Sequence, residues 1–363
     1  MRTSVTPPCA WRPLCAVAME SGHNRRTDDS PTTTSDTKYD WVPYTPGHRK
    51  RNGFIANYET CVAERKRFSG TKWSKPVAYA LQSDAFACGV NRSQTLQYDI
   101  NAYLILQAFM ELIGETGELS TMHERWVDFD RTKSRVEDKR KLLEPLAAHS
   151  AKRDAFIEVY DALVRQVVIP QIVKAQESAL PSTSLPINIV HYASFPCVRV
   201  QQPSDFHTIR AHVDSMYGHG PCSVNCWLPL TELDTTGGNS LFVESFPGAE
   251  DFEPIQVKVG QIKLFDGASC SHFTVANTSN KTRVSLDFRV VVDDLFRFTE
   301  NNDESIKSIK TNANDVDESL HYRVGGYFSS AQLNRETGEW KRVTSGKPCI
   351  KHGFPHSNKE EVG

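Results

Sequence analysis

The stretch HFTVANTSNKTRVSLDFRVVV at residues 272–292 decides the fold that we predict from the sequence. Val, Phe and Thr are frequent at both ends of the stretch, which is typical of β-strands. The segment NTSNK at residues 277–281 lies between them and is rich in turn-forming residues. The stretch therefore predicts two neighbouring antiparallel strands, His272–Ala276 and Arg283–Val292.

Similar strand-like segments precede this pair. Short runs rich in Val, Ile and Phe recur from residue 187 onward, separated by turn residues such as those at 237–239 and 247–248. These runs are Ile187–Tyr192, Val198–Gln201, Ser223–Leu228, Ser240–Val243, Ile255–Val259 and Gln261–Phe265. About eight strands at this spacing favour a jelly-roll, also called a double-stranded β-helix, over residues 185–295.

Helices are expected upstream of the strands, between residues 40 and 180. Leu96–Ile113 is almost wholly apolar and long enough for a buried helix. Thr121 and Glu124 have the spacing of a capping box. One helical face then carries five apolar residues: Phe156, Tyr160, Leu163, Val164 and Val167. Pro170 is expected to end or kink that helix. The predicted fold class is therefore α+β, with a helix-rich N-terminal half packed around the jelly-roll core.

The chain is expected to comprise three parts. Residues 1–37 contain the low-complexity segment SPTTTSDT and are predicted to be a disordered extension. Their first 19 residues hold two arginines and no acid, so a weak targeting segment is the alternative. Residues 38–300 are predicted to form a single domain. Residues 301–363 are predicted to be a C-terminal appendage with a β-hairpin that turns at Glu336–Glu339.

Composition excludes several classes of protein. The chain of 363 residues has 42 Lys and Arg against 44 Asp and Glu, a net charge of −2. This balance gives no general attraction to nucleic acid or to an anionic membrane. No run approaches the 18 or so apolar residues of a transmembrane helix. The nine cysteines are scattered and odd in number, so we expect reduced thiols in an intracellular, cytoplasmic protein, with an organelle address in residues 1–37 as the alternative. The sequence leaves the oligomeric state open.

Three residues of the strand region have the chemistry of a metal site. His212 and Asp214 are two residues apart, so on a strand both side chains leave the same face. His272 follows 58 residues later. Two histidines and one carboxylate form the facial triad of non-haem Fe(II) oxygenases, which leaves open positions on the metal. Taken singly, His212 has the alternative of a buried strand histidine, and Asp214 that of a turn cap. Their joint occurrence with His272 favours the metal site.

Arg283 and Ser285 add a candidate anion site to the neighbouring strand. A guanidinium takes a carboxylate through two parallel hydrogen bonds, and Ser285 shares its face of the strand. A cosubstrate that chelates the metal through a keto acid and is anchored at its far carboxylate is 2-oxoglutarate. The alternative for Arg283 is a surface ion pair.

Substrate binding is predicted from the neighbours of these residues. Four residues are candidates: Arg199, Tyr217, His219 and Arg289. If Arg283 points inward, strand alternation turns Asp287 and Arg289 inward too. Such side chains suit a polar, carboxylated small molecule. The alternatives are that Asp287 and Arg289 neutralise one another, or that they lie past the end of the barrel.

The pattern His212-x-Asp214, His272, Arg283-x-Ser285 resembles the Fe(II)/2-oxoglutarate-dependent dioxygenase superfamily. The context WLPL at 227–230, GGNSLFVES at 237–245 and GQIKLFDG at 260–267 is similar to the streptomycin-biosynthesis branch, within or beside the phytanoyl-CoA-hydroxylase-like enzymes. The resemblance covers residues 185–295. It implies that the two histidines and Asp214 bind iron, that Arg283 anchors 2-oxoglutarate, and that Ser285 assists.

The resemblance implies a dioxygenase that uses Fe(II), 2-oxoglutarate and O2, with ascorbate as a helpful reductant. The expected substrate is a polar, carboxylated small molecule of specialised metabolism, with neither nucleic acid nor membrane as a partner. Hydroxylation and oxidative ring closure, for example kainoid-synthase-like cyclisation of an amino-acid derivative, both stay open. Halogenation is disfavoured because halogenases of this superfamily replace the metal carboxylate. Three alternatives remain: an acyl hydroxylase like phytanoyl-CoA hydroxylase, an enzyme acting on macromolecules, and a catalytically silent binding homologue.

Overall fold

The computed structural model describes residues 94–126, 140–179, 186–204, 208–209, 211–214, 219, 223–234, 238–245, 251–268, 270–294, 296, 323–347, 349–351 and 354–356. All of them belong to one compact unit, Tyr39–Gly363. The predicted extension at 1–37 and the predicted helical stretch at 40–93 lie outside the described residues. None of the described helices is both long and apolar enough to cross a membrane.

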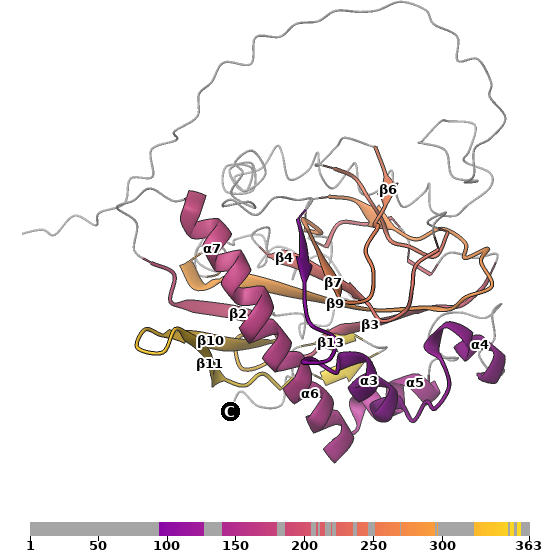
Figure 1. Cartoon of the computed structure of the whole chain (residues 1–363), viewed down its shortest axis with the longest axis horizontal. Helices are drawn as coiled ribbons and strands as arrows, with labels where there is room; N and C mark the ends of the chain where they lie inside the picture. The colour runs from indigo at the N-terminus through magenta and orange to yellow at the C-terminus, as the bar shows by residue number, and fades with distance from the viewer. Residues whose placement is uncertain are drawn as a thin grey trace, which may run out of the picture. The chain divides into compact units, whose positions relative to one another are not determined.

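The described residues combine helices with antiparallel sheet, as the α+β prediction requires (Figure 1). The large sheet has eight strands in the order β1-β7-β4-β9-β2-β10-β11, and β3 also pairs with β9. Its strands are β1 (Thr95–Gln97), β2 (Ile189–Ala193), β3 (Cys197–Gln201), β4 (Val224–Pro229), β7 (Gln261–Phe265), β9 (Arg283–Val292), β10 (Phe328–Asn334) and β11 (Glu339–Thr344). A small sheet has the order β6-β5-β8, with β5 at Phe242–Val243, β6 at Glu253–Pro254 and β8 at His272–Phe273. β12 (Cys349–Lys351) and β13 (Phe354–His356) pair with one another.

The central strand of this arrangement is β9, which has the bounds predicted from the sequence. It pairs with β2, β3 and β4, and all ten of its residues are buried. Because β9 is buried, its side chains must be apolar or, where they are charged, must have a hydrogen-bonding or charged partner. Its even-numbered residues Leu286 and Phe288 belong to the main hydrophobic cluster, whereas Arg283, Asp287 and Arg289 occupy the opposite face.

Two predicted strands differ in extent from the structure. Ile255–Val259 is not a strand, because Ile255 and Val257 pack against Trp227 while the short strand β6 lies just before them. β8 is shorter than the predicted His272–Ala276. Its pairing ends at Phe273, because the Thr274 hydroxyl accepts hydrogen bonds from the backbone N–H groups of residues 208 and 209.

The helices whose full extent is described lie between residues 105 and 179, and residues 293, 294 and 296 after β9 are helical as well. They are α3 (Ile105–Ile113), the 3-10 turn η2 (Leu119–Thr121), α4 (Met122–Arg125), α5 (Arg140–Ala147), α6 (Ala151–Leu163), the π segment η3 (Val164–Val168) and α7 (Ile169–Ala179). The predicted helix at Leu96–Ile113 is wrong in its first half. Residues 95–97 pair with β7 as strand β1, and a turn around Asp99 follows, in which its carboxylate accepts from the N–H of Asn101. Tertiary pairing therefore overrides the apolar pattern.

Two further helix predictions are corrected. The capping box does not form, because the Thr121 hydroxyl bonds instead to the carbonyl of Glu118 and to the Arg125 guanidinium. Of the two outcomes expected at Pro170, an end or a kink of the helix, the end does not occur, because the helix continues as α7. The π segment immediately before it widens the turn in which a proline lacks an N–H and crowds the preceding carbonyl.

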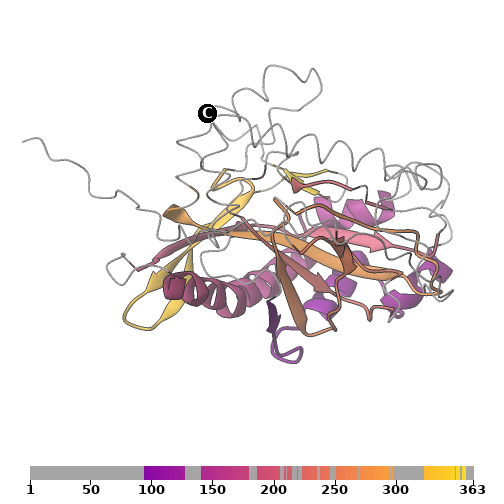
Figure 2. The same cartoon turned by 90° about the horizontal axis from the view of Figure 1, so that it is seen from above.

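Helix α6 covers the apolar face of the large sheet, and Figure 2 shows the long magenta helix running along one side of the orange strands. Phe156 is fully buried, and its ring lies 5.5 Å from that of Phe195 and 6.0 Å from that of Phe109. The Tyr160 ring meets Phe288 of β9 edge-on at 5.3 Å, and its hydroxyl donates to the carbonyl of Ala193. The helices therefore occupy one face of β9 and leave its charged face to the site.

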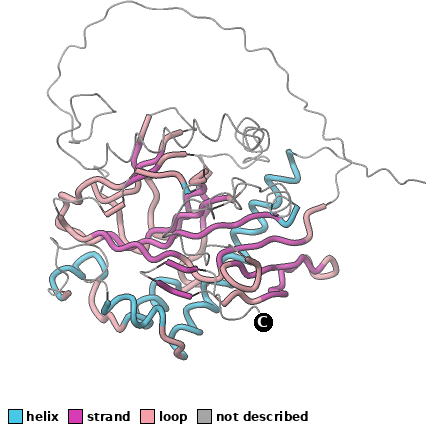
Figure 3. The backbone as a smooth tube through the Cα atoms, turned by 180° about the vertical axis from the view of Figure 1, so that it is seen from behind, coloured by secondary structure: helices cyan, strands magenta, loops and turns pink. Residues whose placement is uncertain are grey.

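The C-terminal hairpin is part of the large sheet, although the sequence suggested an appendage. A turn at residues 335–338 joins β10 to β11, and β10 pairs with β2 over five residues (Figure 3). Ala331 of β10 and Trp340 of β11 belong to the main hydrophobic cluster.

We expect Phe156→Ala to lower the free energy of unfolding by about 3–5 kcal/mol, because it removes a fully buried ring and leaves a cavity. Urea unfolding followed by circular dichroism measures the change. Val343→Ala is the matched control, since Val343 is 55% exposed, and it should change stability by less than about 0.5 kcal/mol. Equal effects of the two substitutions would contradict the packing of α6 described above.

Candidate active site

The structure brings His212, Asp214 and His272 together. His272 begins β8, and His212 lies across from it in an isolated antiparallel bridge, with N–H to carbonyl distances of 2.9 and 3.2 Å. The two imidazole rings are 4.2 Å apart between centroids. One ligand atom from each of the three side chains lies within 4.8 Å of the others, and all three residues are buried. Two imidazoles and one carboxylate at this separation suit a ferrous ion.

The two oxygens of Asp214 have different surroundings. Oδ1 lies 3.5 Å from Nε2 of His212 and 3.5 Å from Nε2 of His272. Oδ2 accepts hydrogen bonds from Arg289 Nε at 3.1 Å, from Arg289 NH2 at 2.6 Å and from Asn225 Nδ2 at 2.6 Å. The hydrogen bonds from Arg289 and Asn225 therefore hold Oδ2, and only Oδ1 faces the two histidines. This arrangement suits a monodentate carboxylate ligand.

The surroundings of Asp214 keep it ionised. Burial raises the pKa of its carboxyl, but the charge of Arg289, with smaller contributions from the two neighbouring histidines, outweighs burial and holds the pKa well below its usual range. The same ion pair raises the pKa of Arg289 against the opposing effect of burial. A metal carboxylate has to be deprotonated, so this pairing prepares Asp214 for that role.

His272 is oriented by its own backbone. Its Nδ1 lies 3.0 Å from the carbonyl of Cys270, which can only accept a hydrogen bond, so Nδ1 carries the proton. Nε2 then has its lone pair directed toward Asp214 and His212. An outer hydrogen bond of this kind commonly fixes the tautomer and orientation of metal-binding histidines.

Arg283 is a buried cation whose partners are all neutral. Its guanidinium donates to the carbonyl of Asn239 at 3.1 Å, to the Ser285 hydroxyl at 2.9 Å and to Gln201 Oε1 at 2.8 Å. The Trp227 ring lies 5.9 Å from it, within cation–π range. Burial, with a smaller effect of the Arg199 charge, lowers the pKa of Arg283 to about 9. Among the described residues no carboxylate pairs with it, so the site suits an anionic ligand.

The two halves of the site share an apolar wall. Trp227 stacks near Arg283, while the Phe265 ring meets His272 edge-on at 5.4 Å. Both aromatic residues belong to one buried cluster with Leu241, Ile255 and Val257. Buried apolar side chains therefore lie beside both His272 and Arg283, and a low-polarity environment of this kind strengthens charge interactions.

The candidate substrate residues have different surroundings from those expected. Arg289 is 2% exposed and bound to Asp214, and it also lies 3.5 Å from Asp287, so it does not offer an unpaired charge to a substrate. The sequence alternative, neutralisation by Asp287, is thus present in addition to the contact with Asp214. Arg199 lies 3.4 Å from Asp287 and keeps 15% of its side chain exposed. His219 is buried against the Tyr327 ring, and Tyr217 lies outside the described residues.

Sequence reasoning assigned no contact to three residues of the site. Asn225 lies opposite Arg289 in the β4–β9 register and shares its contact with Asp214. Gln201 lies opposite Arg283 in the β3–β9 register and accepts its hydrogen bond. Trp227 was noted only as part of a motif. Period-2 alternation on β3 and β4 was the available signal, but the register needed to apply it comes only from the fold.

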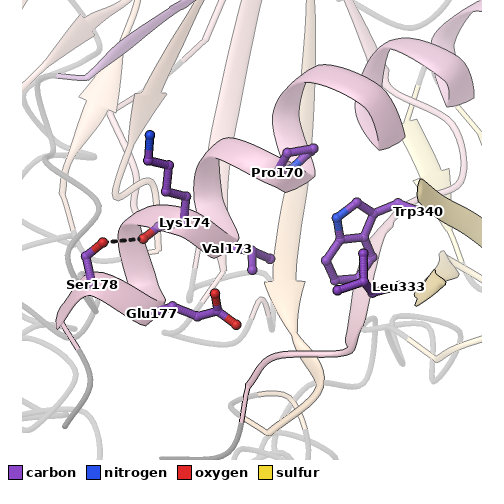
Figure 4. Close-up of a pocket in the computed structure, with 7 residues that line it drawn as sticks. All are labelled: Pro170, Val173, Lys174, Glu177, Ser178, Leu333 and Trp340. Carbon is purple, nitrogen blue, oxygen red and sulfur yellow. Dashed lines mark hydrogen bonds between the residues drawn. The ribbon is translucent and has the colours of Figure 1, made fainter. Parts of the chain in front are cut away.

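A separate pocket of about 400 Å³ lies between α7 and the β10–β11 hairpin (Figure 4). It is lined by Pro170, Val173, Lys174, Glu177, Ser178, Leu333 and Trp340. None of the candidate site residues lines it. We therefore place the chemistry at the His-Asp-His cluster instead.

We expect Arg289→Gln to weaken metal binding by about 10- to 100-fold, because the substitution frees Asp214 Oδ2 to rotate toward the metal or to protonate. Calorimetric titration with Co(II) measures the affinity. Arg335→Gln, which removes an exposed guanidinium, is the control. Arg289→Lys keeps the charge but loses the fork, so we expect an intermediate affinity. If both Arg289 variants bound Co(II) as tightly as the wild type while circular dichroism showed a native fold, Arg289 would not be needed to orient Asp214.

Comparison with known proteins adds a sequence relationship. No protein-family model matches the chain. The streptomycin biosynthesis protein StrG of Streptomyces griseus is 33% identical over 105 residues, which are 29% of this chain and 48% of StrG. The match thus spans about half the length of that relative.

Several solved structures resemble the chain loosely. A non-heme monooxygenase, ThoJ in complex with nickel, has a TM-score of 0.33 and 12% identity over 57% of this chain and 77% of its own. The α-ketoglutarate-dependent epimerase SnoN has a TM-score of 0.34 and 13% identity over 59% and 83%. A prolyl-4-hydroxylase of Pseudomonas putida has a TM-score of 0.29 and 14% identity over 59% and 90%. We draw the family likeness from sequence. The chain carries a His-Asp-His site, and the resemblance to the streptomycin-biosynthesis proteins that its motifs indicated is confirmed by the match to StrG.

Proposed function

We propose that the protein is an Fe(II)/2-oxoglutarate-dependent oxygenase acting on a polar, carboxylated small molecule. The observation that carries the proposal is the cluster of His212, Asp214 and His272, with the outer oxygen of Asp214 already held by Arg289. Such a donor set leaves half of an octahedral ion open to other ligands. Among the described residues no fourth side chain joins the cluster, whereas a closed structural site would be expected to supply one.

The roles of the side chains follow from their contacts. His212 Nε2, His272 Nε2 and Asp214 Oδ1 would hold iron, which supplies oxygen activation when it is bound. The carbonyl of Cys270 keeps the proton of His272 on Nδ1. Trp227 and Phe265 exclude water beside the metal ligands. The protein thus contributes position and a dry environment, whereas the cofactor contributes the redox chemistry.

Arg283 would anchor the far carboxylate of 2-oxoglutarate, and Ser285 would assist. A guanidinium carries five N–H donors, and only three of those on Arg283 are occupied by described residues. A carboxylate would fill the two remaining positions in a bidentate pair. It would also compensate the burial that lowers the pKa of Arg283. O2 is the second cosubstrate in this proposal, and ascorbate would keep the metal reduced.

The finer fold assignment belongs to the same proposal. We propose that the large sheet and the small sheet β6-β5-β8 are the two sheets of a jelly-roll. Two observations support this proposal. His212 and His272, two of the candidate metal ligands, face one another in an antiparallel bridge, and His272 also pairs with Val243 of β5 in the small sheet. A double-sheet core of this kind encloses a site between its sheets.

Charge counting supports a carboxylated substrate. Arg199, Arg283 and Arg289 bring three positive charges to the charged face, and Asp214 and Asp287 bring two negative ones. Iron(II) and 2-oxoglutarate would cancel one another, so one positive charge remains. A single substrate carboxylate would neutralise it, whereas the balanced net charge of −2 gives no support to a nucleic-acid or membrane partner. Hydroxylation and ring closure both use the same machinery.

We expect His212→Ala, Asp214→Asn and His272→Ala each to abolish succinate release from 2-oxoglutarate, because each removes one of three metal ligands. The measurement combines succinate assay with metal content of the purified variants. Circular dichroism controls for folding. Full turnover in any one variant with iron still bound would contradict the proposal. A wild-type protein that binds metal but releases no succinate would also contradict it, and would favour a catalytically silent homologue.

We expect Arg283→Lys to raise the KM for 2-oxoglutarate at least about tenfold, since lysine keeps the charge but loses the planar fork. Steady-state kinetics of succinate release measure the effect, with Arg335→Lys as the surface control. The KM for the primary substrate should change much less. The reverse ranking would identify Arg283 as a substrate residue.

A further inference from the structure

Asp287 and Arg199 form a second charged pair on the site face of the large sheet. Asp287 lies on β9 and Arg199 on β3, and these strands pair in register Cys197 with Asp287 and Arg199 with Ser285. Arg199 NH2 lies 3.4 Å from Asp287 Oδ2. The corresponding distance in the Arg289–Asp214 pair is 2.6 Å. The charged atoms of Arg199 and Asp287 are therefore farther apart than those of Arg289 and Asp214.

One oxygen of Asp287 is left without a hydrogen bond. Asp287 is 5% exposed, and within the described part of the chain its buried Oδ1 has no partner. Its Oδ2 lies 3.4 Å from Arg199 and 3.5 Å from Arg289. A buried polar atom without a partner is costly, and such atoms often mark a position that a ligand or ion completes. Oδ1 therefore calls for a donor from outside this network.

The pair faces the site rather than the helical layer. Asp287 alternates with Leu286 and Phe288, which pack into the main hydrophobic cluster beneath α6. It shares its face with Arg283, the cosubstrate anchor, and with Arg289, which holds Asp214. Trp227 lies opposite Asp287 in the β4–β9 register. A ligand of this pair would thus sit beside both the metal cluster and the aromatic wall.

We infer that Arg199 and Asp287 bind the head group of a free α-amino acid, an inference that rests on the proposed oxygenase function for placing that amino acid beside the metal. The ammonium group donates to Asp287 Oδ1, and the carboxylate accepts from the Arg199 fork. The ammonium and carboxylate groups of an α-amino acid are bonded to the same carbon. This short separation matches the short distance between the charged groups of Arg199 and Asp287. A plain carboxylic acid would leave Oδ1 without a donor, and a plain amine would bring no carboxylate to the Arg199 guanidinium.

Calorimetric titration tests the inference with defined probes. The protein, loaded with Co(II) and 2-oxoglutarate, is titrated with each of the common L-amino acids. Every amino acid that binds is then compared with its N-acetyl derivative and its carboxamide. We expect at least one free amino acid to bind, and both derivatives to bind at least about tenfold more weakly, because each loses one charge-assisted contact. No binding by any free amino acid, or equal binding by either derivative, would overturn the inference.

Substitutions assign the two contacts. Asp287→Asn should remove the preference for the free amine over the N-acetyl derivative, while Arg199→Gln should remove the preference for the carboxylate over the carboxamide. Glu339→Gln and Lys341→Gln, which neutralise an exposed pair 3.9 Å apart, are the matched controls and should keep both preferences. Unchanged preferences in Asp287→Asn and Arg199→Gln would overturn the assignment.

The two proposals fail in distinguishable ways. Binding of Co(II) and 2-oxoglutarate without binding of any amino acid leaves the oxygenase proposal standing and overturns the head-group site. If the protein binds an amino acid with both preferences but does not bind metal, the head-group site stands and the oxygenase proposal is overturned. Each titration therefore bears on one proposal by itself.

Discussion

The ion pair between Arg289 and Asp214 is the interaction on which the rest of the site depends. Both residues are buried, so neither charge could be kept there without the other. The pair joins β9 to the segment that carries His212, and Asn225 of β4 adds a third element. It fixes which oxygen of Asp214 faces the histidines. A buried pair of this kind adds little stability compared with an apolar core, and its value lies in orientation.

Strand β9 explains how one segment serves two purposes. Its apolar residues pack beneath the aromatic side chains of α6, as the contact between Tyr160 and Phe288 illustrates. Its charged residues line the opposite face, where Arg283 finds only neutral partners and Arg289 finds a carboxylate. The strand is buried on both faces, so each charged side chain on the site face needs a partner in the protein or in a bound ligand.

Electrostatic asymmetry divides the site into regions with different tasks. Asp214 is paired closely with Arg289, and the low pKa of this carboxyl keeps it ionised. Around Arg283 and Asp287 the partners are incomplete, since a guanidinium has only neutral contacts and a carboxylate oxygen has none within the described residues. Tight pairing positions the permanent machinery, and incomplete pairing marks where exchangeable ligands are expected to bind.

The sequence by itself determined the strand at 283–292, a hairpin turn within one residue of its place at 335–338, and the three residues of the His-Asp-His cluster, because period-2 alternation and residue chemistry are local properties. It could not determine the partner of Arg289, since Asp214 is 75 positions away and only the β4–β9 register brings Asn225 and Arg289 to it. It misassigned the start of the helix predicted at Leu96–Ile113, because residues 95–97 pair with β7 as a strand. Strand pairing between distant segments depends on register, and register is a property of the whole sheet rather than of any one stretch.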